Sequence, residues 1–193
     1  MPRPLVPERR ERILDAAERL ILAHGFDTMA VAEIAESSGI GKGAVYLEFA
    51  GKREVLDAVL RRALERLRQR VQDDVGDDHR LSTAYRATAR AVVADPLMTA
   101  AFLDDAGVLG RHVESISGPR YRARHLGVIE WVRALQQRGA IRAEVDAEHL
   151  ALALSSATIG LLSAARLIGP LAADDLEGAI DTLGVMAAIF EQG

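Results

Sequence analysis

The chain has 193 residues, of which 49% are hydrophobic and 27% charged, and this balance excludes a disordered, collagen-like or low-complexity protein. Because it contains no cysteine, disulfide frameworks, thiolate metal sites and cysteine nucleophiles are excluded as well. The net charge of −4 conceals an asymmetry, since residues 1–70 carry 13 basic and 11 acidic side chains while residues 71–193 carry 11 and 17. The front part is therefore expected to meet a polyanion, but residues 1–53 balance at eight against eight, so local placement of charge must decide any contact.

Apolar residues recur three and four positions apart along nearly the whole chain, and alternating β-branched runs are missing. The sequence therefore predicts an all-α fold of about nine helices. With their caps, the expected helices cover residues 8–24, 31–38, 42–49, 52–72, 80–94, 96–108, 120–138, 146–167 and 174–190.

Glycine, proline and aspartate mark the expected helix ends. Gly25 suits a C-cap of the first helix, and Asp146 suits an N-cap of the eighth. Pro96 and Pro119 suit the starts of the sixth and seventh helices, where a missing N–H is tolerated. Asp174 or Asp175 is expected to cap the last helix. Two connecting segments stand out: the acidic run Asp73–Asp78, expected as a domain boundary, and Gly107–Gly118, the candidate for a long mobile loop.

Residues 31–49 read V-A-E-I-A-E-S-S-G-I-G-K-G-A-V-Y-L-E-F, the pattern of a helix, a tight turn and a second helix. Gly39 can take the positive φ of the turn, and the small side chain of Ala35 lets the second helix cross close to the first. Three apolar side chains are expected to fill the wedge between the two helices: Ile34, Ile40 and Val45. The spacing predicts a helix-turn-helix unit that the first helix braces from behind.

The N-terminal region resembles the tetracycline-repressor-type (TetR) family of bacterial transcription regulators from residue 9 to about residue 60. The similar segments are R-x-x-I-L-D-A-A, H-G-F-D, the helix-turn-helix stretch and G-K-R-E-V-L. The resemblance implies a DNA-binding domain over residues 1–51 and a helical ligand-binding and dimerisation domain over residues 52–193, connected by the helix that starts at Lys52. It also implies a homodimer without a cofactor that binds a palindromic operator in double-stranded DNA, acts as a repressor and is released by a small molecule.

By the same resemblance, the second short helix is similar to the recognition helix that enters the major groove. The residues implied to face bases or phosphates are Lys42, Gly43, Ala44, Tyr46, Leu47 and Lys52. Their chemistry fits, since Lys42 is a donor at a helix start, Gly43 permits close approach of the backbone, and Leu47 offers methyl groups to thymine. The competing interpretation is that Tyr46 and Leu47 are core residues of a small helical bundle.

Four positions depart from the family pattern, and each loses a group that relatives direct to DNA or to a helix cap. A hydroxyl residue is usual near Met29 and Ala30, at Gly41 and at Ala44, and an aromatic residue or histidine is usual at Glu48. We expect Glu48 at the flank where the DNA backbone passes. Its carboxylate would repel phosphate there, unless it accepts a hydrogen bond from a cytosine amino group.

The larger part of the chain carries two groups of candidate residues. Small residues on the last two helices favour a four-helix interface with a second copy, although the same residues also suit the chain's own core. The expected interface residues are Ala151, Ser155, Gly160, Ser163, Leu183, Met186 and Ala187. Large or titratable side chains on the middle helices suit a small-molecule pocket. These are Phe102, Trp131, Tyr85, Met98, His125, Arg111 and His112.

Other functions have less support. The segment from Gly39 to Ala44 fits the dinucleotide fingerprint G-x-G-x-x-A, but it follows a helix where a strand is needed. A di-iron bundle needs two Glu-x-x-His pairs, and only Asp146-x-x-His149 comes close. The arginine-rich run Arg61–Arg70 is expected to be a solvated helix face in preference to a phosphate-binding one. The alternative function that remains is a dimeric small-molecule sensor with weakened DNA binding that acts through a protein partner.

The sequence predicts a cytoplasmic protein. Charged residues occupy the start of the chain, where an export signal would need an apolar stretch. The longest uncharged stretch, Leu150–Ala165, has 16 residues, whereas a membrane-spanning helix needs about 20. No membrane contact is therefore expected.

Overall fold

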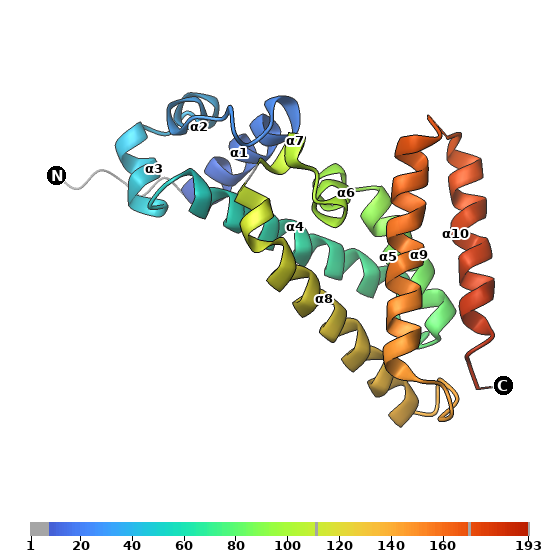
Figure 1. Cartoon of the computed structure of the whole chain (residues 1–193). Helices are drawn as coiled ribbons and strands as arrows, with labels where there is room; N and C mark the ends of the chain where they lie inside the picture. Colours follow the sequence, from blue (N-terminus) through green and yellow to red (C-terminus); the bar gives the residue numbers. More distant parts are fainter. Residues whose placement is uncertain (1–7, 111, 170, 193) are drawn as a thin grey trace.

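The structure is a computed structural model that describes residues 8–110, 112–169 and 171–192, and for residues 112–121 and 165 it describes the backbone alone. Within these residues the chain forms ten helices and no strand, apart from an isolated bridge between Ile141 and Glu191 (Figure 1). The predicted all-α fold is confirmed. The helices are α1 (Arg9–His24), α2 (Val31–Ser38), α3 (Lys42–Glu48), α4 (Lys52–Val75), α5 (Leu81–Val93), α6 (Pro96–Leu103), α7 (Ala106–Leu109), α8 (His112–Gln137), α9 (Ala147–Leu167) and α10 (Ala173–Ala188).

Several helix ends lie where the local sequence predicts them. Gly25 caps α1 with a φ of 80°, and Gly39 caps α2 in the left-handed region with a φ of 65°. Pro96 occupies the first turn of α6, where the side chain of Asp95 accepts hydrogen bonds from two backbone N–H groups. Asp146 caps α9 in the same way. The predicted roles of Gly25, Gly39, Pro96 and Asp146 are confirmed.

The segment between α6 and α8 differs from the prediction. The loop expected over Gly107–Gly118 is wrong, because Asp105 caps the additional short helix α7 and α8 already begins at residue 112. Pro119 therefore lies inside α8 and not at its start. A proline inside a helix costs about 3 kcal/mol relative to alanine, so this position is unfavourable for helix propensity although the helix of 26 residues continues through it. Asp174 and Asp175 lie in the first turn of α10 and do not cap it, a position where their charge still favours the helix dipole.

The helices form two connected cores. Helices α1–α3 make the helix-turn-helix unit at one end of the molecule, and α4 runs from this unit into the larger part (Figure 1). The first core fills the helix-turn-helix unit and continues into α4 and α6. It includes the predicted wedge residues Ile34, Ile40 and Val45, which are all buried. The second core lies among α5, α8, α9 and α10. Because the first core continues across residue 52, the domain boundary there stays a proposal.

Helix α9 carries an unusually apolar surface. The segment Ala147–Ala164 is long and apolar enough to cross a membrane by length and composition, a criterion that helices of soluble proteins also meet. The sequence argument considered only the uncharged stretch Leu150–Ala165 and therefore did not identify this longer segment. Only 28% of the segment is buried within the chain. An apolar helix that its own chain covers so little has surface left for another contact.

Candidate nucleic-acid interface

Helix α3 divides into a buried face and an exposed face. Val45 is 1% exposed and belongs to the first core, whereas Tyr46 is 49% and Leu47 is 79% exposed. The interpretation of Tyr46 and Leu47 as core residues is therefore wrong. Ala44 is half-buried and packs against the core, which turns it away from the exposed face. The residues that α3 exposes together are Lys42, Gly43, Tyr46 and Leu47.

Two positions that depart from the family pattern lie at helix N-termini. No side chain at Ala30 caps α2, but the Glu33 carboxylate accepts a hydrogen bond from the backbone N–H of Ala30 at 2.7 Å. This is one half of a capping box and it replaces part of the missing hydroxyl. Gly41 precedes α3 without any side-chain cap. The first backbone N–H groups of α3 therefore have no side-chain acceptor at the N-cap position.

Arginines in the first turn of α1 hold the C-terminal ends of both helix-turn-helix helices. Arg12 Nη2 donates to the carbonyl oxygen of Ser38 at 2.6 Å, at the end of α2. Arg9 Nε donates to Glu48 Oε1 at 2.8 Å and its Nη2 binds the same oxygen, at the end of α3. Arg10 Nη1 donates to the carbonyl oxygen of Glu48 at 3.3 Å. Cations are favourable at these helix ends because of the exposed carbonyl groups there.

These contacts correct the placement of Glu48. Its side chain is only 20% exposed and faces α1, where Arg9 neutralises it, so the prediction of an unpaired carboxylate at the DNA flank is wrong. Sequence reasoning assigned no role to Arg9 or Arg12, because their partners lie 39 and 26 residues away along the chain. The one signal in the sequence for such a role was the cluster of arginines, R-R-E-R, at the start of α1.

Lys52 binds carbonyl groups within the protein. Its Nζ donates to the backbone oxygens of Phe26, Asp27 and Met29 at 3.3, 2.9 and 3.3 Å, and it lies 4.8 Å from the centre of the Phe26 ring. An ammonium group has three N–H donors, so these contacts can engage all of them. Lys52 thus ties the start of α4 to the loop that leads into α2.

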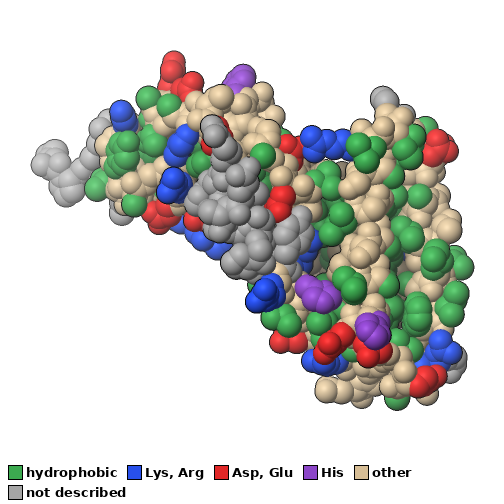
Figure 2. Space-filling view, in the orientation of Figure 1, with side chains coloured by type: hydrophobic (Ala, Val, Ile, Leu, Met, Phe, Trp, Pro, Cys, Tyr) green, Lys and Arg blue, Asp and Glu red, His purple; other side chains and the backbone are tan. Residues whose placement is uncertain are grey.

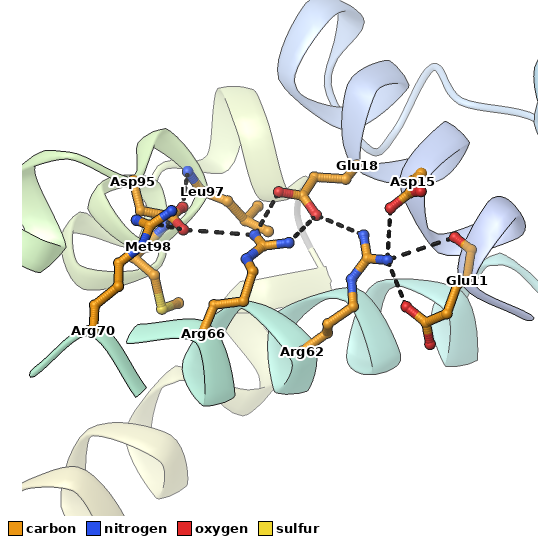
Figure 3. A network of polar contacts seen from close by, with 9 residues as sticks. All are labelled: Glu11, Asp15, Glu18, Arg62, Arg66, Arg70, Asp95, Leu97 and Met98. Carbon is orange, nitrogen blue, oxygen red and sulfur yellow. Dashed lines mark hydrogen bonds and ion pairs between the residues drawn. The ribbon is translucent and has the colours of Figure 1, made fainter. Parts of the chain in front are cut away.

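A network of charged side chains joins α1, α4 and α6 (Figure 3). Glu18 lies between Arg62, which donates to it at 2.8 Å, and Arg66, which donates to it at 2.6 and 2.9 Å. Arg66 also reaches the buried carboxylate of Asp95 at 3.5 Å. Burial alone would raise the pKa of Glu18, but the hydrogen bonds and charges of Arg66 and Arg62 outweigh it and lower that pKa.

The same network revises the interpretation of Arg61–Arg70. Arg62 is neither a phosphate-binding group nor a solvated one, since it also binds Glu11 and Asp15 at 2.9 and 2.7 Å. Arg68, by contrast, is 67% exposed and pairs within α4, with Glu65 at 3.6 Å. The face of α4 that meets α1 is therefore a structural contact between helices.

The structure separates the candidate ligand residues. Met98 and Phe102 pack in or against the first core, while Tyr85 and Trp131 belong to or pack against the second. His125 is half-buried on α8. Arg111 and the side chain of His112 lie outside the described part of the chain. A surface hollow of about 440 Å³ lies elsewhere, and it is lined by Leu20, His24, Thr28, Met29 and Glu33.

The candidate interface residues also fall into two sets. Ala151 and Ala187 are 0% and 2% exposed inside a single chain, so they cannot contact a second copy and the assignment is corrected. Ser155, Ser163 and Leu183 are half-buried, and Gly160 and Met186 are exposed. Apolar side chains gather on the surface of α9 and α10 (Figure 2). The most exposed of these are Leu152, Leu167, Ile168, Val185, Met186 and Ile189.

Known proteins resemble the chain most closely in the helix-turn-helix region. The family model described as bacterial regulatory proteins, tetR family, matches residues 13–59. The HTH-type transcriptional regulator SrpR of Pseudomonas putida is 47% identical over 53 residues, which are 28% of this chain and 25% of that protein. The HTH-type transcriptional repressor KstR of Rhodococcus jostii is 32% identical over 96 residues, which are 49% of this chain and 45% of that protein. The matched segments thus span less than half the length of these relatives.

The fold is similar over almost the whole chain. A crystal structure from Rhodococcus sp., described as that of a TetR-family transcriptional regulator, superimposes with a TM-score of 0.74 at 18% sequence identity. The superposition covers 95% of this chain and 100% of the other. At this identity the likeness concerns the fold alone.

Proposed function

We propose that the chain is a member of the TetR family of bacterial regulatory proteins, and that it is a transcriptional regulator that binds a palindromic operator as a homodimer and is released by a small molecule. In this proposal it acts as a cytoplasmic repressor. The helix-turn-helix unit over residues 1–51 binds DNA, and residues 52–193 bind the ligand and the second copy. The relatives with matching sequence are transcription regulators and not enzymes.

The exposed face of α3 is the observation that carries the proposal. Leu47 is 79% and Tyr46 49% exposed, which is costly for apolar surface unless a partner covers it. Gly43 adds a second argument, because an added Cβ there would meet no atom within 4 Å. A glycine inside a helix costs about 1 kcal/mol relative to alanine, and no contact within the chain requires it. Close approach of DNA to α3 explains both features.

The apolar surface of α9 and α10 supports the proposed homodimer. Leu152, Ser156, Gly160, Ser163 and Leu167 follow one another at helical spacing on the outer side of α9. Small residues at the centre of this row permit close helix packing, and a two-fold axis would place the same row of a second chain against it. Two recognition helices about 34–36 Å apart then read a palindrome.

The charged network offers a route from ligand to DNA in this proposal. Asp95 caps α6 and is reached by Arg66 of α4, which also binds Glu18 of α1 (Figure 3). A ligand that shifts α6 would therefore move charges that hold α1. In the middle of the larger part, the hydroxyl groups of Tyr85 and Thr158 are hydrogen-bonded at 3.3 Å, and burial raises the pKa of the Tyr85 hydroxyl. Tyr85 thus remains a neutral polar group beside which a ligand can bind. A coupling of about 1–3 kcal/mol changes operator affinity roughly 5 to 150-fold.

Two substitutions test the assignment of the interface. Lys52→Ala is expected to weaken binding to all duplexes alike, because it loosens the loop that positions α2 and removes a cation near the DNA backbone. Leu47→Ala is expected to change which base is preferred, because methyl groups read thymine. Titration of the wild type and both variants against several duplexes measures this. An equal loss on every duplex for both variants would contradict the role given to Leu47.

A further inference from the structure

Charge is sorted on the two sides of α1. The acidic residues Glu11, Asp15 and Glu18 face α4, where Arg62 and Arg66 bind them. Arg9 and Arg10 of its first turn instead reach the end of α3. Residues 1–53 carry equal numbers of acids and bases, yet this arrangement leaves positive charge beside the recognition helix. The balanced composition therefore conceals a local basic contact.

Arg10 is held at the C-terminal end of α3 with most of its donors available. Its Nη1 donates to the Glu48 carbonyl oxygen at 3.3 Å, and its guanidinium lies 4.3 Å from the centre of the Phe49 ring. Phe49 is 2% exposed, so this ring is a fixed support. The same Nη1 also lies 3.8 Å from the Glu48 carboxylate, but the Arg10 side chain is 45% exposed, and among the described residues these contacts engage only one of the nitrogens that carry its five N–H donors.

The position of Arg10 relative to DNA follows from the length of α3. Its seven residues extend about 10 Å, and the major groove is about 12 Å wide. A helix of this length in the groove has its ends near the phosphates that border it. Arg10 of α1 binds the carbonyl oxygen of Glu48 at one such end, and Glu48 is two residues along α3 from the exposed Tyr46. Planar guanidinium groups bind phosphate with particularly suitable geometry.

We propose that Arg10 binds a DNA backbone phosphate beside the recognition helix, and that Arg9 enables this contact by neutralising Glu48. The proposal rests on the proposed DNA-binding function and adds a contact to it. Arg9 is a positioning residue here, since its Nε and Nη2 bind Glu48 Oε1, whereas Arg10 lies 3.8 Å from Oε2 and keeps a side chain that is 45% exposed.

The salt dependence of binding to a mixed-sequence duplex tests the proposal. Each phosphate contact contributes about 0.9 to the slope of log affinity against log salt, so Arg10→Ala should reduce the slope by about 1.8 per dimer. Raising salt from about 50 to about 200 mM should then weaken the variant about 12-fold less than the wild type. Arg10→Lys should keep the slope because it keeps the charge. The control is Arg68→Ala, which removes an exposed cation far along α4 and should leave the slope unchanged.

A second pair of variants tests the role of Arg9. Arg9→Ala should weaken binding because it uncovers the Glu48 carboxylate, and Glu48→Gln in the same chain should restore binding. If Arg9 and Arg10 served only the fold, the variants would lower the unfolding temperature and leave the slope unchanged, which would overturn the proposal. A wild-type protein that binds no duplex at any salt concentration would instead overturn the proposed function, and this inference with it. An unchanged slope in Arg10→Ala with normal wild-type binding would overturn the inference alone.

Discussion

Replacing Gly160 with arginine is expected to convert the protein from a dimer into monomers. Gly160 lies at the centre of the exposed row on α9, where an added Cβ meets no atom of the chain within 4 Å. The arginine therefore leaves the protomer undisturbed but places a charge from each chain in the interface. An unpaired charge buried in this way should cost at least about 3 kcal/mol, which weakens dimerisation more than about 100-fold.

Gly127→Arg is the matched control for this prediction. Gly127 is also an exposed helical glycine, on α8, and an added Cβ there meets nothing within 4 Å. Both substitutions should favour the helix by about 1 kcal/mol, so neither should unfold the chain. Sedimentation equilibrium at micromolar concentration should show dimers for the wild type and Gly127→Arg, and monomers for Gly160→Arg. Dimers in all three proteins would exclude the α9 surface as the interface.

Replacing Glu18 with glutamine should lower the free energy of unfolding by about 2 kcal/mol, because Arg66 and Arg62 then lose a charged acceptor in a partly buried site. For a chain of this size, that change corresponds to a fall of roughly 4–8 °C in the unfolding temperature. Glu65→Gln is the control, since Glu65 is 72% exposed and pairs only with Arg68. Its effect should stay below about 1 kcal/mol.

The contribution of Glu18 to the free energy of unfolding should also depend on pH. Its pKa is lower in the folded chain than in the unfolded chain, so the unfolded chain takes up a proton first as pH falls. The stability that ionised Glu18 contributes is complete above its unfolded pKa of about 4.3 and is lost as pH falls through its folded pKa. Thermal unfolding of the wild type and Glu18→Gln should therefore differ at pH 7 and converge in acid. An equal difference at every pH would mean that charge plays no part.

Local signals in the sequence were sufficient to predict the fold and the face of α3. The turn at Gly39 needs a positive φ, which glycine adopts readily. The helical spacing of apolar residues, such as Ile34 in α2 and Val45 in α3, indicates which side of each helix is buried. These properties depend on neighbours within a few residues. The position of Tyr46 and Leu47 on the exposed side follows from the same helical period.

Contacts between distant segments were not predictable in this way. Glu48 has a carboxylate whose partner is 39 residues away, and no periodic pattern connects the two positions. On α9 small residues occupy both sides, so composition could not distinguish the buried Ala151 from the exposed Gly160. Gly107–Gly118 contains the residues of a loop, yet α7 forms there because Asp105 supplies its N-cap, and α8 begins at residue 112. In each case tertiary packing or a capping side chain decides what composition leaves open.

Selection of bound sequences from random duplex DNA tests the central claim most directly, because it requires no knowledge of the operator. The account predicts that the wild-type protein enriches a palindrome whose half-sites are about one helical turn, or a multiple of it, apart. It also predicts that Leu47→Ala enriches a palindrome with a different base at one position of each half-site. Recovery of no enriched sequence by a folded, dimeric wild-type protein would contradict the account and favour a sensor that acts through a protein partner.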